Sequence, residues 1–196
     1  VELISGQTLD VFFQERIFTP LEMVDSGFWL PREKLDRLVT MYAPLEGGGL
    51  QPAEGPDVDR TTRPPALSGG GGLLSTAADY LNFAQMLLNR GQFKGRRLLS
   101  RKTFEVLTTP HLPFPSGEIA TDLGFSMGLG VGVLTDLSQG NRRGSLGSFG
   151  WGGAAGTRFW VDPQEELVGI LLAQTMPGFW RAPEMFENLA YAALVE

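Results

Sequence analysis

The sequence contains no cysteine and a single histidine, His111, among its 196 residues. Disulfide bonds, thiolate catalysis and cysteine-based metal sites are therefore excluded, and one imidazole leaves a metal site without a second histidine ligand. We predict no metal and no cofactor. Long apolar runs are also missing, because the longest, Leu167 to Ala173, is far short of the roughly 20 residues that a membrane-spanning helix needs.

Positive charge is scarce as well. The chain has 16 Lys and Arg against 22 Asp and Glu, which gives a net charge of −6. A net negative chain has no general electrostatic attraction to nucleic acid or to anionic lipid. We therefore predict a small molecule or a protein as the partner, with no nucleic acid and no membrane. The composition leaves the compartment open between the cytoplasm and the periplasm of a bacterium.

Glycine, in contrast, is abundant, at 26 residues or nearly twice the usual share of about 7%. The first part of the chain, residues 1–123, is predicted to be helical, with a long loop at 29–67 that is rich in Pro, Gly and charge. Apolar residues at helical spacing, together with capping residues, predict three helices. These helices run over residues 8–18, from Ser75 or Thr76 to Gly91, and from Ser100 to Pro110.

The second part, residues 124–196, changes to the alternation typical of strands. We predict three antiparallel strands, in the stretches GFSMGLGVGVL, SFGWGGAAGTRFWVDP and ELVGILLAQ, with a hairpin through Asp162, Pro163 and Gln164 between the last two. A terminal helix over 183–195 follows, and it is expected to turn its apolar side to the sheet. That side comprises Met185, Phe186, Leu189, Ala190 and Ala193. The predicted fold is therefore α+β, an antiparallel sheet with flanking helices and a C-terminal helix.

Three short motifs resemble functional sequence patterns, but a missing residue or the predicted secondary structure argues against each. GFSMG, at 124–128, fits the GxSxG motif of a nucleophilic serine, but a strand and not a helix follows Ser126, and His111 precedes it. The run SGGGGLLST lacks the lysine of a phosphate-binding loop. In the tripeptide Tyr80-Leu81-Asn82, the tyrosine lies on the apolar stripe of a predicted helix. We assign Ser126 to a strand and Tyr80 to the core.

The tract GSFGWGGAAGTRFWVDPQEELVGILLAQ resembles the third-motif strand of the penicillin-recognising serine hydrolases. These enzymes include class C β-lactamases, DD-peptidases and, most similar here, family VIII carboxylesterases. The tracts SGGGGLLSTAADYLNFAQMLLNRG and SGQTLDVFFQERIFTPLEM resemble the same superfamily. The resemblance implies a β-lactamase-like fold and hydrolysis of an ester, or of a β-lactam or peptide amide, through an acyl-serine intermediate.

The same resemblance implies a substrate-binding role for Trp151, Gly152, Gly153 and Ala154. Glycines remove side chains from a strand, so that its backbone groups can pair with an acyl substrate. In such an arrangement the amide of Ala154 would supply half of an oxyanion hole. Trp151 stands where the superfamily has a Lys or His, so it can shape an apolar pocket but cannot bind a carboxylate by charge. Small neutral esters are therefore favoured over penicillins.

The sequence also departs from the superfamily, which uses a SxxK pair and a separate tyrosine motif. The lysines are Lys34, Lys94 and Lys102, and none has a serine three positions earlier, so no catalytic residue is predicted in this chain. The chain also opens in what reads as the last turn of a helix. We expect a C-terminal half that has little activity alone and that needs the N-terminal half as partner. The alternatives are a non-catalytic binding module on the same scaffold, and a homo-oligomer through an open sheet edge.

Overall fold

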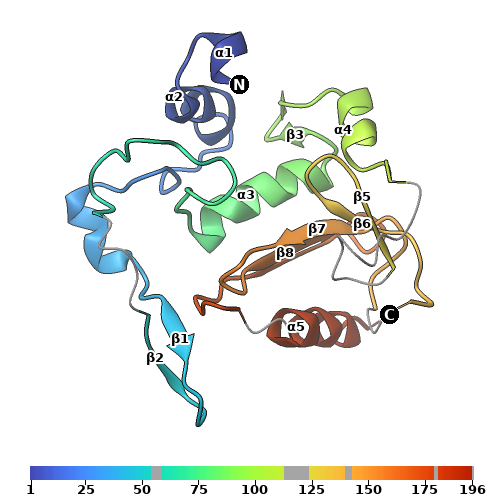
Figure 1. Ribbon diagram of the computed structural model, residues 1–196. Coiled ribbons are helices and arrows are strands. Elements are labelled where there is room, and N and C mark those ends of the chain that lie inside the picture. Colours follow the sequence, from blue (N-terminus) through green and yellow to red (C-terminus); the bar gives the residue numbers. More distant parts are fainter. Residues whose placement is uncertain (54–58, 113–123, 140–142, 179–180, 196) are drawn as a thin grey trace.

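An antiparallel sheet forms the centre of the computed structural model, which describes residues 1–196 except 54–58, 113–123, 140–142, 179–180 and 196 (Figure 1). In the described residues this sheet has five strands in the same order in space as in sequence. The strands are β5 (Phe125–Met127), β6 (Gly132–Leu134), β7 (Phe149–Gly152), β8 (Arg158–Asp162) and β9 (Leu167–Leu171). Every neighbouring pair is antiparallel. The predicted fold class, an antiparallel sheet flanked by helices and closed by a C-terminal helix, is confirmed.

The prediction of three strands in residues 124–196 is wrong, because two of the predicted strands are hairpins. The first stretch turns back at Gly128, whose N–H donates to the carbonyl of Val131 over 2.8 Å, and at Gly130, whose φ is 82°. The second stretch turns back between Gly153 and Gly156, whose N–H donates to the Gly153 carbonyl over 2.9 Å. The alternating pattern continues across both turns because glycine interrupts it without changing its period. Gly128 and Gly130 therefore belong to a turn, not to a strand as predicted.

Helices cover both faces of the sheet. The helix α3 (Ala77–Leu88) lies on one face and α5 (Arg181–Ala192) on the other (Figure 1). The predicted caps of α3 and of α4 (Arg101–Leu107) are confirmed, since the side chains of Thr76 and Ser100 accept hydrogen bonds from backbone N–H groups three residues later. The predicted helix at 8–18 is α2 (Leu9–Phe13) followed directly by a π-helical turn, and a short helix, α1 (Glu2–Ser5), precedes it.

The hydrophobic core lies between the sheet and the helices α3 and α4. Tyr80 packs against it as predicted, with its ring centroid 5.1 Å from that of Phe159 on β8. Phe104 of α4 meets Phe149 of β7 edge to face. Both predicted parts of the chain thus contribute to one core cluster. Its buried residues are Phe18, Leu21, Met23, Ala84, Met86, Leu87, Phe93, Phe104, Val131, Val133, Phe149, Phe159 and Val161.

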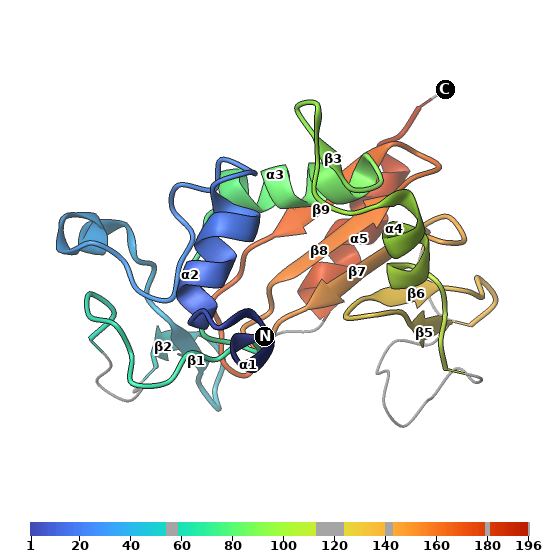
Figure 2. The same cartoon turned by 90° about the horizontal axis from the view of Figure 1, so that it is seen from above.

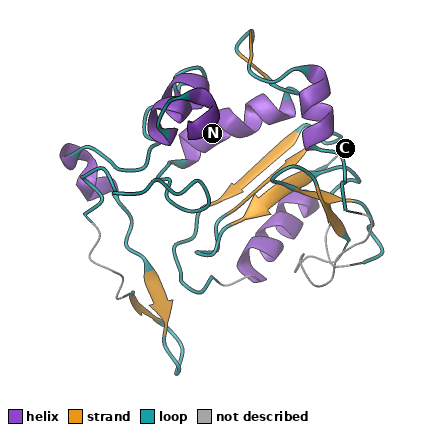
Figure 3. Ribbon diagram, turned by 45° about the horizontal axis from the view of Figure 1, so that its top comes forward, coloured by secondary structure: helices purple, strands orange, loops and turns teal. Residues whose placement is uncertain are grey.

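The predicted loop at 29–67 contains three short regular elements among turns and bends. A 3₁₀ helix spans Arg32–Arg37, and the strands β1 (Tyr42–Pro44) and β2 (Leu50–Pro52) form an antiparallel hairpin. Figure 3 shows this hairpin standing apart from the central sheet. Residues 54–58 of the same loop lie outside the described residues. We call residues 29–67 the excursion below.

The prediction that the apolar side of the terminal helix faces the sheet is only partly right. Phe186 packs edge to face on Trp160 of β8, with their ring centroids 5.7 Å apart, but the rest of that side turns outward. Met185 is 61% exposed and Leu189 is 66% exposed, whereas α5 turns Pro183, Glu187 and Tyr191 inward. The reason is a polar network on this face of the sheet. Arg158 of β8 donates to the Glu187 carboxylate over 3.1 Å, and the Tyr191 hydroxyl donates to a carboxylate oxygen of Asp162 over 2.8 Å.

Asp162 is the centre of this network and is completely buried. Its carboxylate accepts hydrogen bonds from the backbone N–H groups of Ser145, Gln164 and Glu165 as well as from Tyr191. Burial disfavours the charged carboxylate, but these hydrogen bonds outweigh that effect and lower the pKa of Asp162. The predicted hairpin through Asp162 and Gln164 is therefore confirmed, and it also anchors the terminal helix.

Replacing Tyr191 by Phe tests this anchor. The change removes one hydrogen bond to a buried charge and should lower the free energy of unfolding by about 1.5–3 kcal/mol in a urea titration. The matched control is Tyr80→Phe, because the Tyr80 hydroxyl has no hydrogen-bond partner among the described residues, and its stability should barely change. Equal losses in the two variants would contradict the anchor.

Stability should also depend on pH through Asp162. Its pKa in the folded protein lies below the ordinary value of 3.8, so its contribution to stability is present above about pH 4 and is lost as the pH falls through the folded pKa. Below pH 4, the free energy of unfolding should fall less steeply with pH in Asp162→Asn than in the unchanged protein. The two slopes should differ by up to about 1.4 kcal/mol per pH unit. Asp10 and Asp25, each with a pKa lowered to about 2 by its arginine partner, remain in both proteins. Identical acid slopes would refute this role.

Candidate functional site

The strand β7 extends beyond the strand on one of its sides. It pairs with β8 along its whole length, from Phe149 opposite Val161 to Gly152 opposite Arg158. It pairs with β6 only at Phe149 and Gly150. Beyond Gly150, no strand in the described part of the chain covers this side of β7. We call the segment Trp151–Ala154, with its uncovered side, the free edge.

The direction of the backbone groups along the free edge follows from a single hydrogen bond. The Gly153 N–H donates to the carbonyl of Thr157 over 2.8 Å, so Gly153 faces the β8 side. In an antiparallel ladder, successive residues point their N–H and C=O groups to opposite sides. Gly152 therefore points these groups to the uncovered side, where an extended acyl or peptide group can pair with them.

Ala154 lies in the turn that joins β7 to β8. The Gly156 N–H donates to the Gly153 carbonyl over 2.9 Å, which closes a β-turn with Ala154 at its second position. The turn does not use the N–H of that position, and no acceptor for the Ala154 N–H is found among the described residues. Ala154 is exposed, and its carbonyl accepts a hydrogen bond from the Gly178 N–H over 2.9 Å. The Ala154 carbonyl is thus held by a hydrogen bond, while the Ala154 N–H stays available for a substrate.

Trp151 borders the free edge and is 47% exposed. Its ring lies beside Gly132 of β6, where an added Cβ would come within 3.8 Å of the Trp151 atom Cζ3. The indole therefore lies close to the first residue of β6, at the end of the β5–β6 hairpin. Trp151 offers an apolar surface next to two backbone groups able to bind an acyl oxygen.

The excursion supports this turn through a short segment, residues 174–178. Tyr42 of β1 donates its N–H to the Gln174 carbonyl and accepts from the Met176 N–H, both over 2.8 Å. Thr175, which is buried, donates its N–H to the Ala155 carbonyl over 3.1 Å. Sequence reasoning missed this support, because the bonds are backbone to backbone and join positions far apart in the chain. No side-chain pattern marks them.

Residues that the sequence excluded from chemistry have structural roles. Ser126 is buried in β5, and its hydroxyl donates to the carbonyl of Leu112, as expected for a strand residue and not for a nucleophile. The imidazole Nε2 of His111 lies 2.8 Å from the Val106 carbonyl. In the glycine tract at 69–72, only Gly72 has close backbone contacts, since a Cβ there would lie 2.8 Å from the Ser68 carbonyl oxygen.

The lysines are also engaged elsewhere. Lys34 pairs with Asp25, Lys94 with Glu22 and Lys102 with Glu105. Within the described ranges, no group of three His, Asp or Glu residues is arranged to hold a metal ion. The same residues include no helix long and apolar enough to span a membrane. Among the described residues, we take the free edge as the candidate site.

The sequence profile of the family described as Beta-lactamase matches residues 1–194. The chain belongs to the β-lactamase family. It is 34% identical over 188 residues to Protein Rv1367c of Mycobacterium tuberculosis, covering 90% of this chain and 46% of that protein. It is 27% identical over 183 residues to a lovastatin esterase of Penicillium rubens, covering 87% of this chain and 46% of the esterase. The chain thus spans about half the length of these relatives.

Solved structures show the same fold. The structure of EstCE1, described as a hydrolase with promiscuous acyltransferase activity, superposes with a TM-score of 0.82 at 22% identity and covers 97% of this chain and 52% of that one. Simvastatin synthase LovD from Aspergillus terreus superposes with a TM-score of 0.79 at 23% identity, covering 97% and 52%. The resemblance drawn from the three sequence tracts is confirmed.

Gly178 gives a direct test of how the turn is held. A Cβ on this residue would lie 2.6 Å from the Gly156 nitrogen and 2.9 Å from the Ala154 carbonyl oxygen, both backbone atoms. Gly178→Ala should therefore shift the amide resonances of Ala154 and Gly156 and cost about 1–3 kcal/mol of stability. Gly70→Ala is the matched control, because nothing lies within 4 Å of its added Cβ. Unchanged Ala154 and Gly156 resonances would show that residue 178 does not position the turn.

Proposed function

We propose that the protein containing these residues hydrolyses small neutral carboxylic esters through an acyl-serine intermediate. The observation that carries the proposal is the free edge, where Ala154 offers an unused N–H beside the half-exposed ring of Trp151. Membership of the β-lactamase family supports it, as do an esterase among the relatives and a hydrolase with acyltransferase activity among the similar folds.

In this mechanism the free edge stabilises the transition state and positions the substrate. The acyl carbonyl oxygen accepts a hydrogen bond from the Ala154 N–H, which strengthens as negative charge develops on that oxygen. The outward backbone groups of Gly152 hold the extended acyl part, and Trp151 covers its apolar side. Because an indole carries no charge, Trp151 cannot bind the carboxylate of a penicillin as a cation would. We therefore place esters before β-lactams and peptide amides.

The attacking serine and its base are proposed to come from polypeptide outside these 196 residues, since no lysine here follows a serine at SxxK spacing. Two surfaces support the docking of further polypeptide. In the described part of the sheet β9 is an edge strand, and the apolar side chains Met185 and Leu189 on α5 are exposed. The partner that covers them is either the N-terminal half of the same enzyme or a second copy of this chain.

The alternative function is a non-catalytic binding module on the same scaffold. The observation that favours it is that each lysine of the chain pairs with a carboxylate, and that none is available as a base. Such a module would keep the acyl-binding edge and would hold an ester without cleaving it.

Hydrolysis of p-nitrophenyl butyrate separates the two functions. The 196-residue chain alone should show little or no activity, whereas the protein translated from the complete reading frame, or the chain mixed with its N-terminal half, should release p-nitrophenol. No gain of the mixture or of the complete protein over the chain alone would favour the binding module.

The role of the Ala154 amide can be tested in the complete protein by a substitution that removes this N–H group. Ala154→Pro removes it at a turn position where proline is favoured, and kcat should fall about 10²- to 10³-fold with a small change in KM. Ala154→Gly keeps the N–H and is expected to retain activity. An equal loss of kcat in both variants would show that the conformation of the turn matters and that the Ala154 N–H does not.

A further inference from the structure

Positive charge is concentrated in one stretch of this acidic chain. Residues 80–104 contain six of the 16 Lys and Arg and none of the 22 Asp and Glu. The remaining residues therefore carry ten cationic against 22 acidic side chains, so the net charge of −6 averages over two regions of opposite sign. The six cations, which we call the basic patch, are Arg90, Lys94, Arg96, Arg97, Arg101 and Lys102, and all are exposed.

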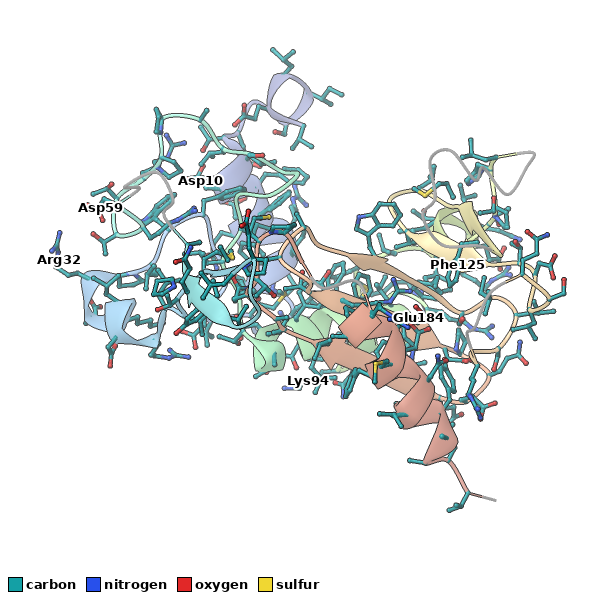
Figure 4. The ribbon with its side chains drawn as sticks, turned by 60° about the horizontal axis from the view of Figure 1, so that its bottom comes forward. Asp10, Arg32, Asp59, Lys94, Phe125 and Glu184 are labelled. Carbon is teal, nitrogen blue, oxygen red and sulfur yellow. The ribbon has the colours of Figure 1, made fainter. Side chains whose placement is uncertain are left out.

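A tight hairpin presents the centre of the basic patch. The strands β3 (Gln92–Phe93) and β4 (Arg96–Arg97) are joined by two residues, Lys94 and Gly95, with φ values of 44° and 81°. Positive φ at both positions is the geometry of the shortest β-hairpin turns. Phe93, which directly precedes the turn, is buried in the core and anchors the hairpin. The hairpin projects from the end of α3 (Figure 2), and Lys94 lies at the outer margin of the molecule (Figure 4).

Acidic groups neutralise the basic patch only in part. Lys94 pairs with Glu22, and Arg101 and Lys102 share Glu105, but all of these side chains are well exposed, so the pairs contribute little. Arg90 and Arg96 have no carboxylate partner among the described residues. A shallow, open depression of about 380 Å³ between Arg90 and Lys94 is lined also by Asn89 and Gln92. This depression is large enough for a phosphate-bearing headgroup.

We propose that the basic patch binds the surface of a membrane that contains anionic lipids. Four to eight clustered Lys or Arg are the number that holds a protein at such a surface. The prediction of no membrane partner came from the net charge of the whole chain. However, salt screens the interaction between charges more than about 8 Å apart at physiological ionic strength. A projecting hairpin can therefore touch a flat anionic surface while the acidic remainder stays at a distance.

The geometry of the hairpin favours a membrane over nucleic acid. Proteins that bind single strands stack bases on exposed aromatic side chains, whereas Phe93, the aromatic residue of this hairpin, is 4% exposed. The proposal is independent of the ester hydrolysis proposed above, because it uses none of the residues of the free edge.

Sedimentation of the 196-residue chain with vesicles tests the proposal. Vesicles containing phosphatidylglycerol should bind the chain at 0.1 M salt, with binding lost at 1 M salt, and vesicles of phosphatidylcholine alone should not bind it. In Lys94→Asn/Arg96→Thr the new Asn-Gly turn and a strand-forming Thr keep the hairpin, and the partition coefficient should fall about 25-fold, or roughly fivefold per cation.

The matched control is Arg143→Thr/Arg181→Gln, which removes the same charge from exposed positions outside the basic patch. This control should bind the anionic vesicles like the unchanged chain. Equal binding by all three proteins, equal binding to the two kinds of vesicle, or tighter binding to a duplex DNA fragment than to the vesicles would each overturn the proposal.

Discussion

The offset between β6 and β7 is the constraint on which the candidate site depends. Because the β5–β6 hairpin turns at Gly128 and Gly130, β6 stops beside Gly150, and β7 continues for two more residues with one side uncovered. The backbone groups of that side would otherwise be hydrogen-bonded within the sheet. The site is thus made by where a strand ends, and the side chain of Trp151 adds only an apolar border.

The two faces of the sheet are held in different ways. The face toward α3 is an apolar core in which Phe149, Phe159 and Val161 meet the helices. The face toward α5 combines the ring contacts of Trp160 with Phe186 and Tyr191 with the charged and hydrogen-bonded groups around Asp162. A buried polar network specifies geometry more strictly than apolar contact does, since each group needs its partner at a defined distance. This difference explains why α5 can leave Met185 and Leu189 in solvent.

The sequence predicted the parts of the fold that local chemistry determines. Thr76 and Ser100 cap helices as expected, and Asp162 begins the hairpin between β8 and β9. The resemblance of three sequence tracts to a known family drew attention to the residues around Trp151. The number of strands was not predictable from alternation, because glycine turns interrupt a strand pattern without altering its period. The orientation of α5 was missed because apolar spacing takes no account of buried partners such as Arg158, which lies on another element.

The connection between the excursion and residues 174–178 constrains how this region of the protein can change. Both hydrogen bonds of Tyr42 to that segment involve its main chain, so exchanging the phenol ring for another side chain leaves them intact. Inserting or deleting one residue before Tyr42 would instead turn the following N–H and C=O groups to the opposite side. The outer surface of this hairpin is therefore free to vary in composition, whereas the register of Tyr42 against residues 174–178 is fixed by these bonds.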